Sequence, residues 1–226
     1  MLARISRKFQ FRRTLNLQEI FRCSKSVIEE KLISSGIKLV AGVDEAGRGA
    51  CAGPLVVAAV ILKDPYAETL SQVRDSKELT PKKRESLFEV IKDEAAAFSI
   101  IEISSQEIDM TGLHKSNLEG MRRAVNGLAV NPQYILTDGY EIDGLPAPAL
   151  AVWKGDQVAI SISAASILAK VYRDRVMQEL DIKYPGYGLA KHKGYVTRSH
   201  MEGLQRLGVS EIHRHSYANI AALINS

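Results

Sequence analysis

Four acidic residues lie at or just after the predicted ends of strands. Carboxylates at such positions can bind metal ions that assist catalysis. The four residues are Asp44, Glu45, Asp138 and Asp156. The C-terminal tips of strands in open α/β sheets commonly bind ligands, so we expect these acids to converge. Asp44 and Glu45 are neighbours, and neighbouring strand residues point to opposite faces. Both can reach one site only if the strand ends or bends there, and Gly47 makes a bend plausible.

Converging carboxylates repel one another unless cations neutralise them. Two divalent ions about 4 Å apart would neutralise such a cluster and could clamp a phosphodiester. Oxygen-only ligands suit Mg²⁺ or Mn²⁺ and argue against zinc. An isolated Asp-Glu pair is usually exposed surface charge, and an Asp before Gly often forms a turn. Three strand ends that all carry acids are harder to explain in that way.

A glycine-rich turn follows the first two acids, with the sequence Ala46-Gly47-Arg48-Gly49. Glycine lets backbone groups approach a ligand closely. Half of a dinucleotide-binding fingerprint would look similar, but that motif needs a third glycine and a following helix. Here position 52 is alanine where the motif needs its third glycine, and Pro54 begins a strand-like run where the motif needs a helix. We therefore reject binding of a nucleotide cofactor.

The elements that must position these residues alternate between strands and helices. Apolar and β-branched runs predict strands at residues 39–44, 55–62, 99–103, 134–137 and 150–154. Helical periodicity, the Thr80-Pro81 start and the Asn131-Pro132 stop predict helices at 18–34, 80–97, 118–130, 160–180, 197–207 and 217–224. This order indicates one α/β domain with a mixed sheet.

Charge is distributed unevenly along the 226 residues. The first 40 residues hold nine Lys or Arg and three Glu, whereas the remainder holds 21 basic and 23 acidic residues. A basic N-terminal arm suggests a polyanionic partner. A solvated tail fits the charge equally well, and residues 1–18 also resemble an organelle-targeting segment.

Cysteines and apolar runs bear on the compartment. Cys23 and Cys51 have no metal-like spacing, and we interpret them as reduced thiols. The longest apolar run, residues 51–62, is too short to cross a bilayer, and no signal-peptide core is evident. These observations predict a cytoplasmic protein without membrane association, with organelle targeting through residues 1–18 as the alternative.

Residues 183–215 form a basic segment near the C-terminus. They contain six Lys or Arg, two Glu and four of the five histidines, interleaved with Tyr184, Tyr187 and Tyr195. Such a mixture suits a nucleic-acid-binding face, although a solvated loop region is the simpler interpretation. His213 and His215 lack partners at zinc spacing, so we expect them to be structural or to face phosphate.

Several ordered segments between residues 39 and 217 resemble the ribonuclease HII family. The segments are Gly42-Val43-Asp44-Glu45-Ala46-Gly47-Arg48-Gly49, Asp75-Ser76-Lys77, Lys154-Gly155-Asp156, Ala164-Ala165-Ser166-Ile167-Leu168-Ala169-Lys170, Lys191-His192-Lys193-Gly194-Tyr195 and Ile212-His213-Arg214. One departure is Ala50, where the family commonly has proline, and it predicts a looser turn. Residues 1–37 lie outside the resemblance.

The resemblance implies a fold and a set of roles. It implies an RNase H-like fold, a five-stranded mixed sheet flanked by helices, with a basic and partly helical extension at 1–37. The catalytic domain would span 38–226, with a helical region from about 184. The four catalytic and metal-binding acids would be Asp44, Glu45, Asp138 and Asp156. Gly47, Arg48, Gly49 and Tyr195 would recognise the 2′-hydroxyl, and Ser76, Lys77 and Lys170 would contact phosphates.

The implied function is hydrolysis of RNA paired with DNA, by a monomer that uses two Mn²⁺ or Mg²⁺ ions. The enzyme would also cut 5′ of single ribonucleotides embedded in DNA, leaving a 3′-hydroxyl and a 5′-phosphate. Ribonuclease HIII shares the fold and the acids, but the intact Gly-Arg-Gly triplet favours HII. An integrase-like or junction-resolving nuclease is a more distant alternative. A non-catalytic hybrid-binding protein would not need all four acids.

Overall fold

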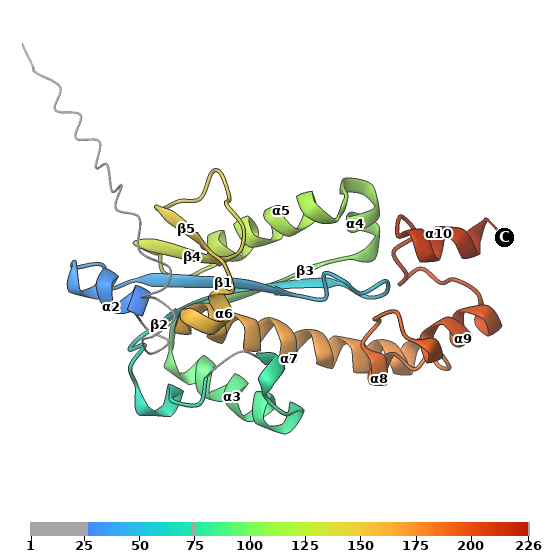
Figure 1. Cartoon of the computed structure of the whole chain (residues 1–226), viewed down its shortest axis with the longest axis horizontal. Helices are drawn as coiled ribbons and strands as arrows, with labels where there is room; N and C mark the ends of the chain where they lie inside the picture. The colour runs from blue at the N-terminus through green and yellow to red at the C-terminus, as the bar shows by residue number, and fades with distance from the viewer. Residues whose placement is uncertain (1–26, 74–75, 226) are drawn as a thin grey trace, which may run out of the picture.

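A five-stranded mixed sheet forms the centre of the computed structural model, which describes residues 27–73 and 76–225 (Figure 1). The strand order is β3-β2-β1-β4-β5. The first three strands pair antiparallel, and β4 and β5 continue the sheet in parallel with β1. The strands are β1 Val40–Ala46, β2 Leu55–Leu62, β3 Ala95–Ile103, β4 Tyr134–Asp138 and β5 Ala149–Val152. The predicted mixed sheet with five strands is confirmed.

Strand β2 matches its predicted bounds, and all eight of its residues are buried. This explains its continuous apolar run, since helices cover both faces of the sheet here. The next boundary was predicted less well. Helix α3, Pro81–Glu94, was expected to reach residue 97, but β3 already begins at Ala95. Ala95 and Ala97 pair with Leu62 and Ile61 of β2, so tertiary pairing overrides the helical propensity of alanine.

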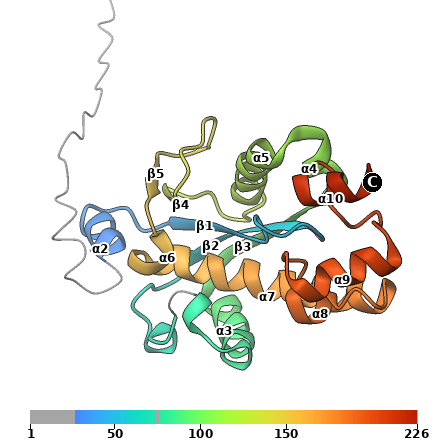
Figure 2. The ribbon, with the colours of Figure 1, turned by 45° about the vertical axis from the view of Figure 1, so that its right-hand side comes forward.

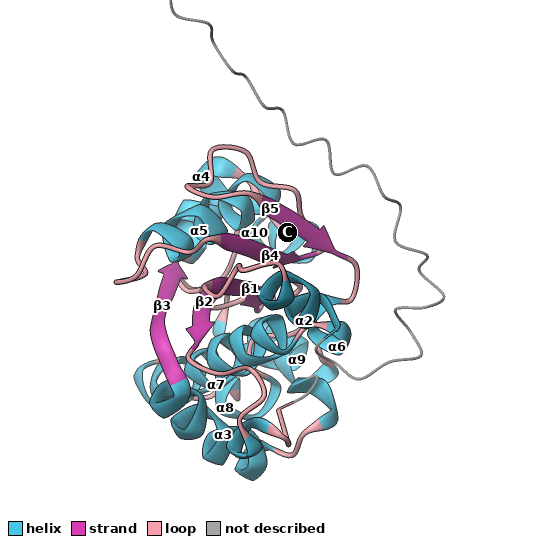
Figure 3. Ribbon diagram, turned by 90° about the vertical axis from the view of Figure 1, so that its left-hand side faces the viewer, coloured by secondary structure: helices cyan, strands magenta, loops and turns pink. Residues whose placement is uncertain are grey.

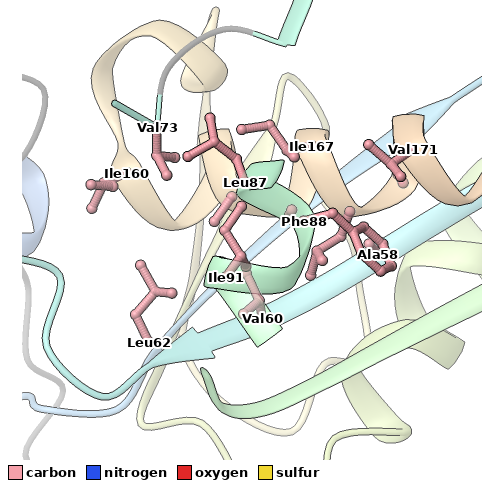
Figure 4. Close-up of a cluster of buried hydrophobic side chains, with 14 of the residues drawn as sticks. Ala58, Val60, Leu62, Val73, Leu87, Phe88, Ile91, Ile160, Ile167 and Val171 are labelled. Carbon is pink, nitrogen blue, oxygen red and sulfur yellow. The ribbon is translucent and has the colours of Figure 1, made fainter. Parts of the chain in front are cut away.

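Helices cover both faces of the sheet (Figure 3). On one face, α3 and the long helix α7, Ile160–Lys183, pack on alternate residues of β2, with Ala58, Val60 and Leu62 against Leu87 and Phe88 (Figure 4). The opposite face of β1 and β2 packs on α5, Leu113–Asn126, through Met121 and Ala124. The alternation of the strand residues thus divides the core into two layers.

The start of α7 lies unusually close to β1. A Cβ on Gly42 would come within 2.1 Å of the Ser161 carbonyl carbon, so only glycine fits at this point of the strand. The first turns of α7 are rich in serine and alanine, as predicted, and Ser163 and Ala165 are fully buried. These small side chains allow the helix to rest directly on the strand that carries Asp44 and Glu45.

Helix α2, Val27–Ser34, packs against the end of the sheet. Its Ile28 and Leu32 contact a small apolar cluster that includes Leu136 and Ile162. The buried Glu29 carboxylate accepts hydrogen bonds from the backbone N–H (3.0 Å) and hydroxyl (2.7 Å) of Ser161, at the N-terminus of α7. Burial raises the Glu29 pKa, and these bonds partly offset the rise. The predicted helix from residue 18 is therefore seen from 27 onward, and residues 18–26, with Cys23, lie outside the described residues.

Short helices complete the chain. They are η1 Glu68–Leu70, η2 Ser76–Glu78, α4 Ser105–Thr111, α6 Gly155–Val158, α8 Leu189–His192, α9 Arg198–Leu207 and α10 Ala218–Ile224. Helices α8 and α9 lie at the C-terminal end of α7, whereas α10 lies beside α4 (Figure 2). Together they confirm the predicted helical extension. Across residues 27–73 and 76–225, no helix is long and apolar enough to span a membrane.

Candidate active site

Strands β1 and β4 bring three of the predicted acids together. The predicted end of the strand at Asp44 is wrong, because β1 continues to Ala46 and pairs with β2 from Ala41 to Ala46. Its pairing with β4 stops at Val43 and Thr137, however, and β4 ends one residue later at Asp138. Asp44 and Glu45 therefore remain on opposite faces, and Asp138 lies near enough to affect both electrostatically.

The electrostatics of the cluster show uncompensated negative charge. Burial raises the pKa of Asp44 well above its ordinary value, and the charges of Glu45 and Asp138 raise it further. Burial and Asp138 likewise raise the pKa of Glu45 to about 7, although the charges of Arg48 and Lys77 partly offset the rise. Burial and neighbouring negative charge therefore both disfavour the ionised forms of Asp44 and Glu45.

One oxygen of the cluster has the properties of a cation ligand. Glu45 Oε2 is buried and has no hydrogen-bond partner in the structure. Asn117 of α5, which faces Glu45, is fully buried, and neither polar atom of its side chain is hydrogen-bonded. Unpaired buried oxygens beside repelling carboxylates suit a hard divalent cation. Among the described residues, no three acid, histidine or cysteine side chains already have the spacing of a metal site, so the acids do not form a closed cage.

Asp156 lies beside this cluster rather than within it. It belongs to the short helix α6 and is buried, with its Oδ2 atom 3.3 Å from the Lys77 ammonium. The Gly155 N–H donates to Asp138 Oδ1 at 2.7 Å and ties α6 to the end of β4. The preceding residue, Lys154, has a left-handed backbone with φ +53°. This tight turn replaces the predicted end of a straight strand and directs the chain from β5 into α6.

The glycine-rich turn closes over a buried arginine. Gly47 has φ +90°, and a Cβ there would lie 1.9 Å from Arg173 Nε. The Ala50 N–H donates to the Gly47 carbonyl at 3.2 Å, a bond that proline could not make. With alanine at position 50, the turn therefore has a hydrogen bond that a proline there would remove. The Arg48 side chain is exposed, and its guanidinium lies 5.5 Å from the centre of the Tyr140 ring.

A cavity of about 220 Å³ joins the acids to the turn and to the predicted phosphate contacts. It is lined by Asp44, Glu45, Ala46, Gly47, Arg48, Gly49, Ser76, Lys77, Asp138, Ser166, Lys170 and Tyr195. The Ser76 hydroxyl lies 2.9 Å from that of Ser166, and Lys170 Nζ donates to Asp174 at 2.7 Å. The cavity thus contains every predicted site residue except Asp156. Asp75 lies outside the described residues.

Tyr195 lines this cavity from the loop that follows α8. Its ring packs 5.6 Å from the Arg173 guanidinium carbon and is partly exposed. Arg173 is completely buried and donates to the carbonyls of Pro54 (2.9 Å), Lys193 (2.9 Å) and Ala52 (3.1 Å). One guanidinium therefore joins the segment that follows the glycine-rich turn to the loop that carries Tyr195, and it packs closely on Gly47.

A chain of buried histidines fixes the backbone of Tyr195. His213 Nδ1 lies 3.1 Å from the Ser210 backbone nitrogen, and its Nε2 lies 3.2 Å from His200 Nε2. His200 then donates from Nδ1 to the Tyr195 carbonyl at 3.0 Å. The third ring, His192, stacks on His200 with centroids 4.2 Å apart. The prediction that His213 is structural fits this arrangement, whereas His215 is exposed.

The buried histidines are expected to contribute less to stability in mild acid than at neutral pH. Burial, followed by the neighbouring His200, lowers the pKa of His213 from 6.5 to about 4, and burial also lowers that of His200. Between these values the unfolded chain binds protons that the folded one excludes. The histidine contribution to the free energy of unfolding should therefore drop as pH falls from 6.5 towards 4, by on the order of 2 kcal/mol at pH 5. The raised pKa of Glu45 acts in the opposite direction over this range, so the test compares wild type with His213→Gln by urea unfolding at pH 7.5 and pH 5. Between the two pH values the wild type should lose about 2 kcal/mol relative to the variant, and equal changes in both proteins would contradict the prediction.

Four functional-site residues were given no role by the sequence analysis, although Ser166 and Arg214 stand in segments that resemble the family. Asn117 and Ser166 approach the acids from α5 and α7, and Arg173 and Arg214 lie under the glycine-rich turn. One signal was available for Asn117, because a polar residue precedes Met121 and Ala124 by four and seven positions on the buried face of its helix. A buried arginine bonded to backbone carbonyls leaves no comparable pattern.

Comparison with known proteins agrees with this geometry. The family model for ribonuclease HII matches residues 41–220. The ribonuclease HII of Corynebacterium jeikeium is 54% identical over 196 residues, which cover 86% of this chain and 94% of the relative.

Two solved structures share the fold. The crystal structure of the ribonuclease H2 from Pyrococcus horikoshii OT3 superposes with a TM-score of 0.73 at 32% identity, covering 82% of this chain and 97% of the other. Bst-RNase HIII in complex with Mn²⁺ reaches a TM-score of 0.68 at 17% identity, covering 90% of this chain and 73% of the other. The second likeness concerns the fold alone, and together they identify the sheet and its helices as an RNase H-like fold.

Proposed function

This chain belongs to the ribonuclease HII family, and we propose that it hydrolyses RNA paired with DNA and cuts 5′ of ribonucleotides embedded in duplex DNA. The observation that carries the proposal is the shared cavity, in which Asp44, Glu45 and Asp138 lie with the turn 47–49 and Tyr195. Acids alone would suit many nucleases. Acids beside a backbone-lined turn suit one that must detect a single 2′-hydroxyl.

We propose that Asp44, Glu45, Asp138 and Asp156 hold divalent cations, Mn²⁺ or Mg²⁺. Bst-RNase HIII, which shares the fold, is known in complex with Mn²⁺. The unpaired Glu45 Oε2 atom and the mutual repulsion of the acids support the assignment. Two bound ions would activate water and stabilise the leaving 3′-oxygen, so that the products carry a 3′-hydroxyl and a 5′-phosphate.

The protein's own groups hold these acids and receive the substrate. The Gly155 N–H orients the Asp138 carboxylate, and Lys77 reaches Asp156. Lys77 and Lys170 lie on the cavity wall with Ser76, where they would contact phosphates of the duplex. Gly47, Arg48 and Gly49 would bring their backbone to the ribose, with Tyr195 packed against the sugar.

We further propose that the protein acts as a cytoplasmic monomer, with residues 38–226 as the catalytic domain. Residues 1–37 would form a basic extension that approaches the nucleic acid, and the described helix α2 would anchor it to the end of the sheet. Ribonuclease HIII remains the nearest alternative. The intact Gly-Arg-Gly triplet favours the HII activity, and cleavage at a lone ribonucleotide would separate the two.

One assay tests the proposal. Duplex DNA with a single ribonucleotide is incubated with the protein and Mn²⁺, and the cut is mapped on a sequencing gel beside an all-DNA duplex and an RNA–DNA hybrid. We expect one cut, on the 5′ side of the ribonucleotide, and none in the all-DNA duplex. Cleavage of the hybrid without cleavage at the lone ribonucleotide would favour the HIII activity instead.

Recognition of the junction is expected to depend on the Tyr195 ring more than on its hydroxyl. Tyr195→Phe keeps the aromatic body and loses a hydrogen-bonding group, whereas Tyr195→Ala loses both. We expect a loss of at most about fivefold for Phe and about 100-fold for Ala in kcat/KM at a lone ribonucleotide. Melting temperatures accompany the rates, because the ring packs on Arg173. The prediction is falsified if folded Tyr195→Ala cleaves the lone ribonucleotide and the hybrid at the wild-type ratio.

A further inference from the structure

The carbonyl of Arg48, at the centre of the glycine-rich turn, is held by two side chains from the C-terminal region. Arg214 NH1 donates to it at 3.0 Å, and the Tyr217 hydroxyl donates to it at 2.9 Å. These two donors are also joined, since Arg214 NH1 lies 2.8 Å from the Tyr217 hydroxyl. Residues more than 160 positions apart therefore meet at one peptide group of the turn.

Arg214 is itself fixed. Its side chain is completely buried, and Nε and NH2 both donate to the Gly53 carbonyl, at 3.2 and 3.0 Å. Its backbone N–H donates to the Cys51 carbonyl at 2.8 Å, and an antiparallel bridge joins Ala52 to His213. The guanidinium thus spans the residues that follow the turn and the turn itself. A planar fork with several donors can do this, whereas a lysine ammonium cannot.

Tyr217 adds the second donor from the start of α10. Its ring is half-buried between two apolar clusters, and the Arg214 guanidinium carbon lies 5.3 Å from the ring centre. The ring therefore stays in place without its hydroxyl. This separates the packing of Tyr217 from its hydrogen bond to Arg48.

Holding this carbonyl orients the adjacent N–H. In a trans peptide the C=O of one residue and the N–H of the next point in opposite directions. The Arg48 carbonyl points to the buried pair, so the Gly49 N–H points away from it, and Gly49 lines the cavity. Within the described part of the chain, no protein acceptor bonds this N–H. It is a donor presented to whatever occupies the cavity.

We infer that Arg214 and Tyr217 are positioning residues for recognition of the ribonucleotide. They lock the peptide between Arg48 and Gly49, so that its N–H meets an oxygen of the ribose or its phosphate. The inference rests on the proposed function. It assigns discrimination at the junction to side chains that themselves lie behind the turn, away from the substrate.

The test is Tyr217→Phe, which removes one hydroxyl and keeps the packed ring. Its matched control is Tyr172→Phe, because the Tyr172 hydroxyl bonds Glu102 at 2.7 Å, away from the turn. For wild type and both variants, kcat/KM is measured on a single-ribonucleotide duplex and on an RNA–DNA hybrid, together with the melting temperature. The hybrid offers many 2′-hydroxyls, whereas the lone ribonucleotide depends on one junction contact.

We expect Tyr217→Phe to lower the ratio of the two rates, lone ribonucleotide over hybrid, by about three- to tenfold. Tyr172→Phe should keep the wild-type ratio. A merely structural role would lower both rates alike, so an unchanged ratio in Tyr217→Phe overturns the inference while the proposed function stands. If the wild type cuts neither substrate, the proposed function fails and the inference fails with it.

Discussion

Asp138→Asn is expected to lower the cleavage rate by about 1,000-fold or more, with little change in the fold. The amide keeps the shape of the side chain, and its oxygen can still accept the Gly155 N–H that now bonds Asp138 at 2.7 Å. The substitution removes the negative charge of Asp138, which acts electrostatically on both Asp44 and Glu45. Several kcal/mol of transition-state stabilisation depend on cations held there, which corresponds to this loss of rate.

Two further measurements separate a lost cation from a damaged fold. Mn²⁺ should raise the melting temperature of the wild type, because a ligand that binds only the folded state stabilises it, and this rise should shrink in the variant. Affinity for the hybrid should persist, since phosphate contacts supply most of it. The matched control is Asp143→Asn, in the exposed turn between β4 and β5, which removes the same charge. Near-normal turnover of Asp138→Asn at saturating Mn²⁺ would remove Asp138 from the mechanism.

The strands that carry the site were predictable because each is short, apolar and bounded by glycine or a charged residue. Strand β2 was predicted residue for residue. The errors fall where a local pattern competes with pairing. Residues 95–97 continue the helical composition of α3, yet they complete the ladder with β2. Helix α5 was predicted to run to Asn131-Pro132, but it ends at Asn126 with Gly127 as its C-cap.

The site was predictable as a set of residues but not as a geometry. Strand-end position singled out the acids, whereas the sequence could not reveal that β1 runs on past Asp44 and places Glu45 on the other face. Nor could it reveal that Asp156 enters a helical turn after the left-handed Lys154. The supporting arginines were missed because their partners are backbone carbonyls far along the chain, and carbonyls carry no sequence signal.

Gly47→Ala is the second substitution with a large expected effect, and Arg173 is the reason. The added Cβ would lie 1.9 Å from Arg173 Nε. The end of an exposed arginine could move aside, but this one is fully buried and bonded to three carbonyls. The residue must also keep φ +90°, which disfavours alanine. We expect the free energy of unfolding to fall by about 3–5 kcal/mol, as overpacking at a rigid site adds to backbone strain.

Gly112→Ala separates the two contributions. Gly112 has φ +84°, and no atom lies within 4 Å of the Cβ that alanine would add, so this variant reports backbone strain without a clash. It should cost about 1–2 kcal/mol and leave cleavage unaffected. Urea unfolding of both variants gives the difference, and equal losses would show that Arg173 yields to the methyl group. A larger loss in Gly47→Ala, with folded protein that cleaves the lone ribonucleotide poorly, would tie the glycine to its buried support. Glycine would then be required at this position for two reasons. It can adopt φ +90°, and it leaves room for Arg173, whose hydrogen bonds join the segment after the turn to the Tyr195 loop.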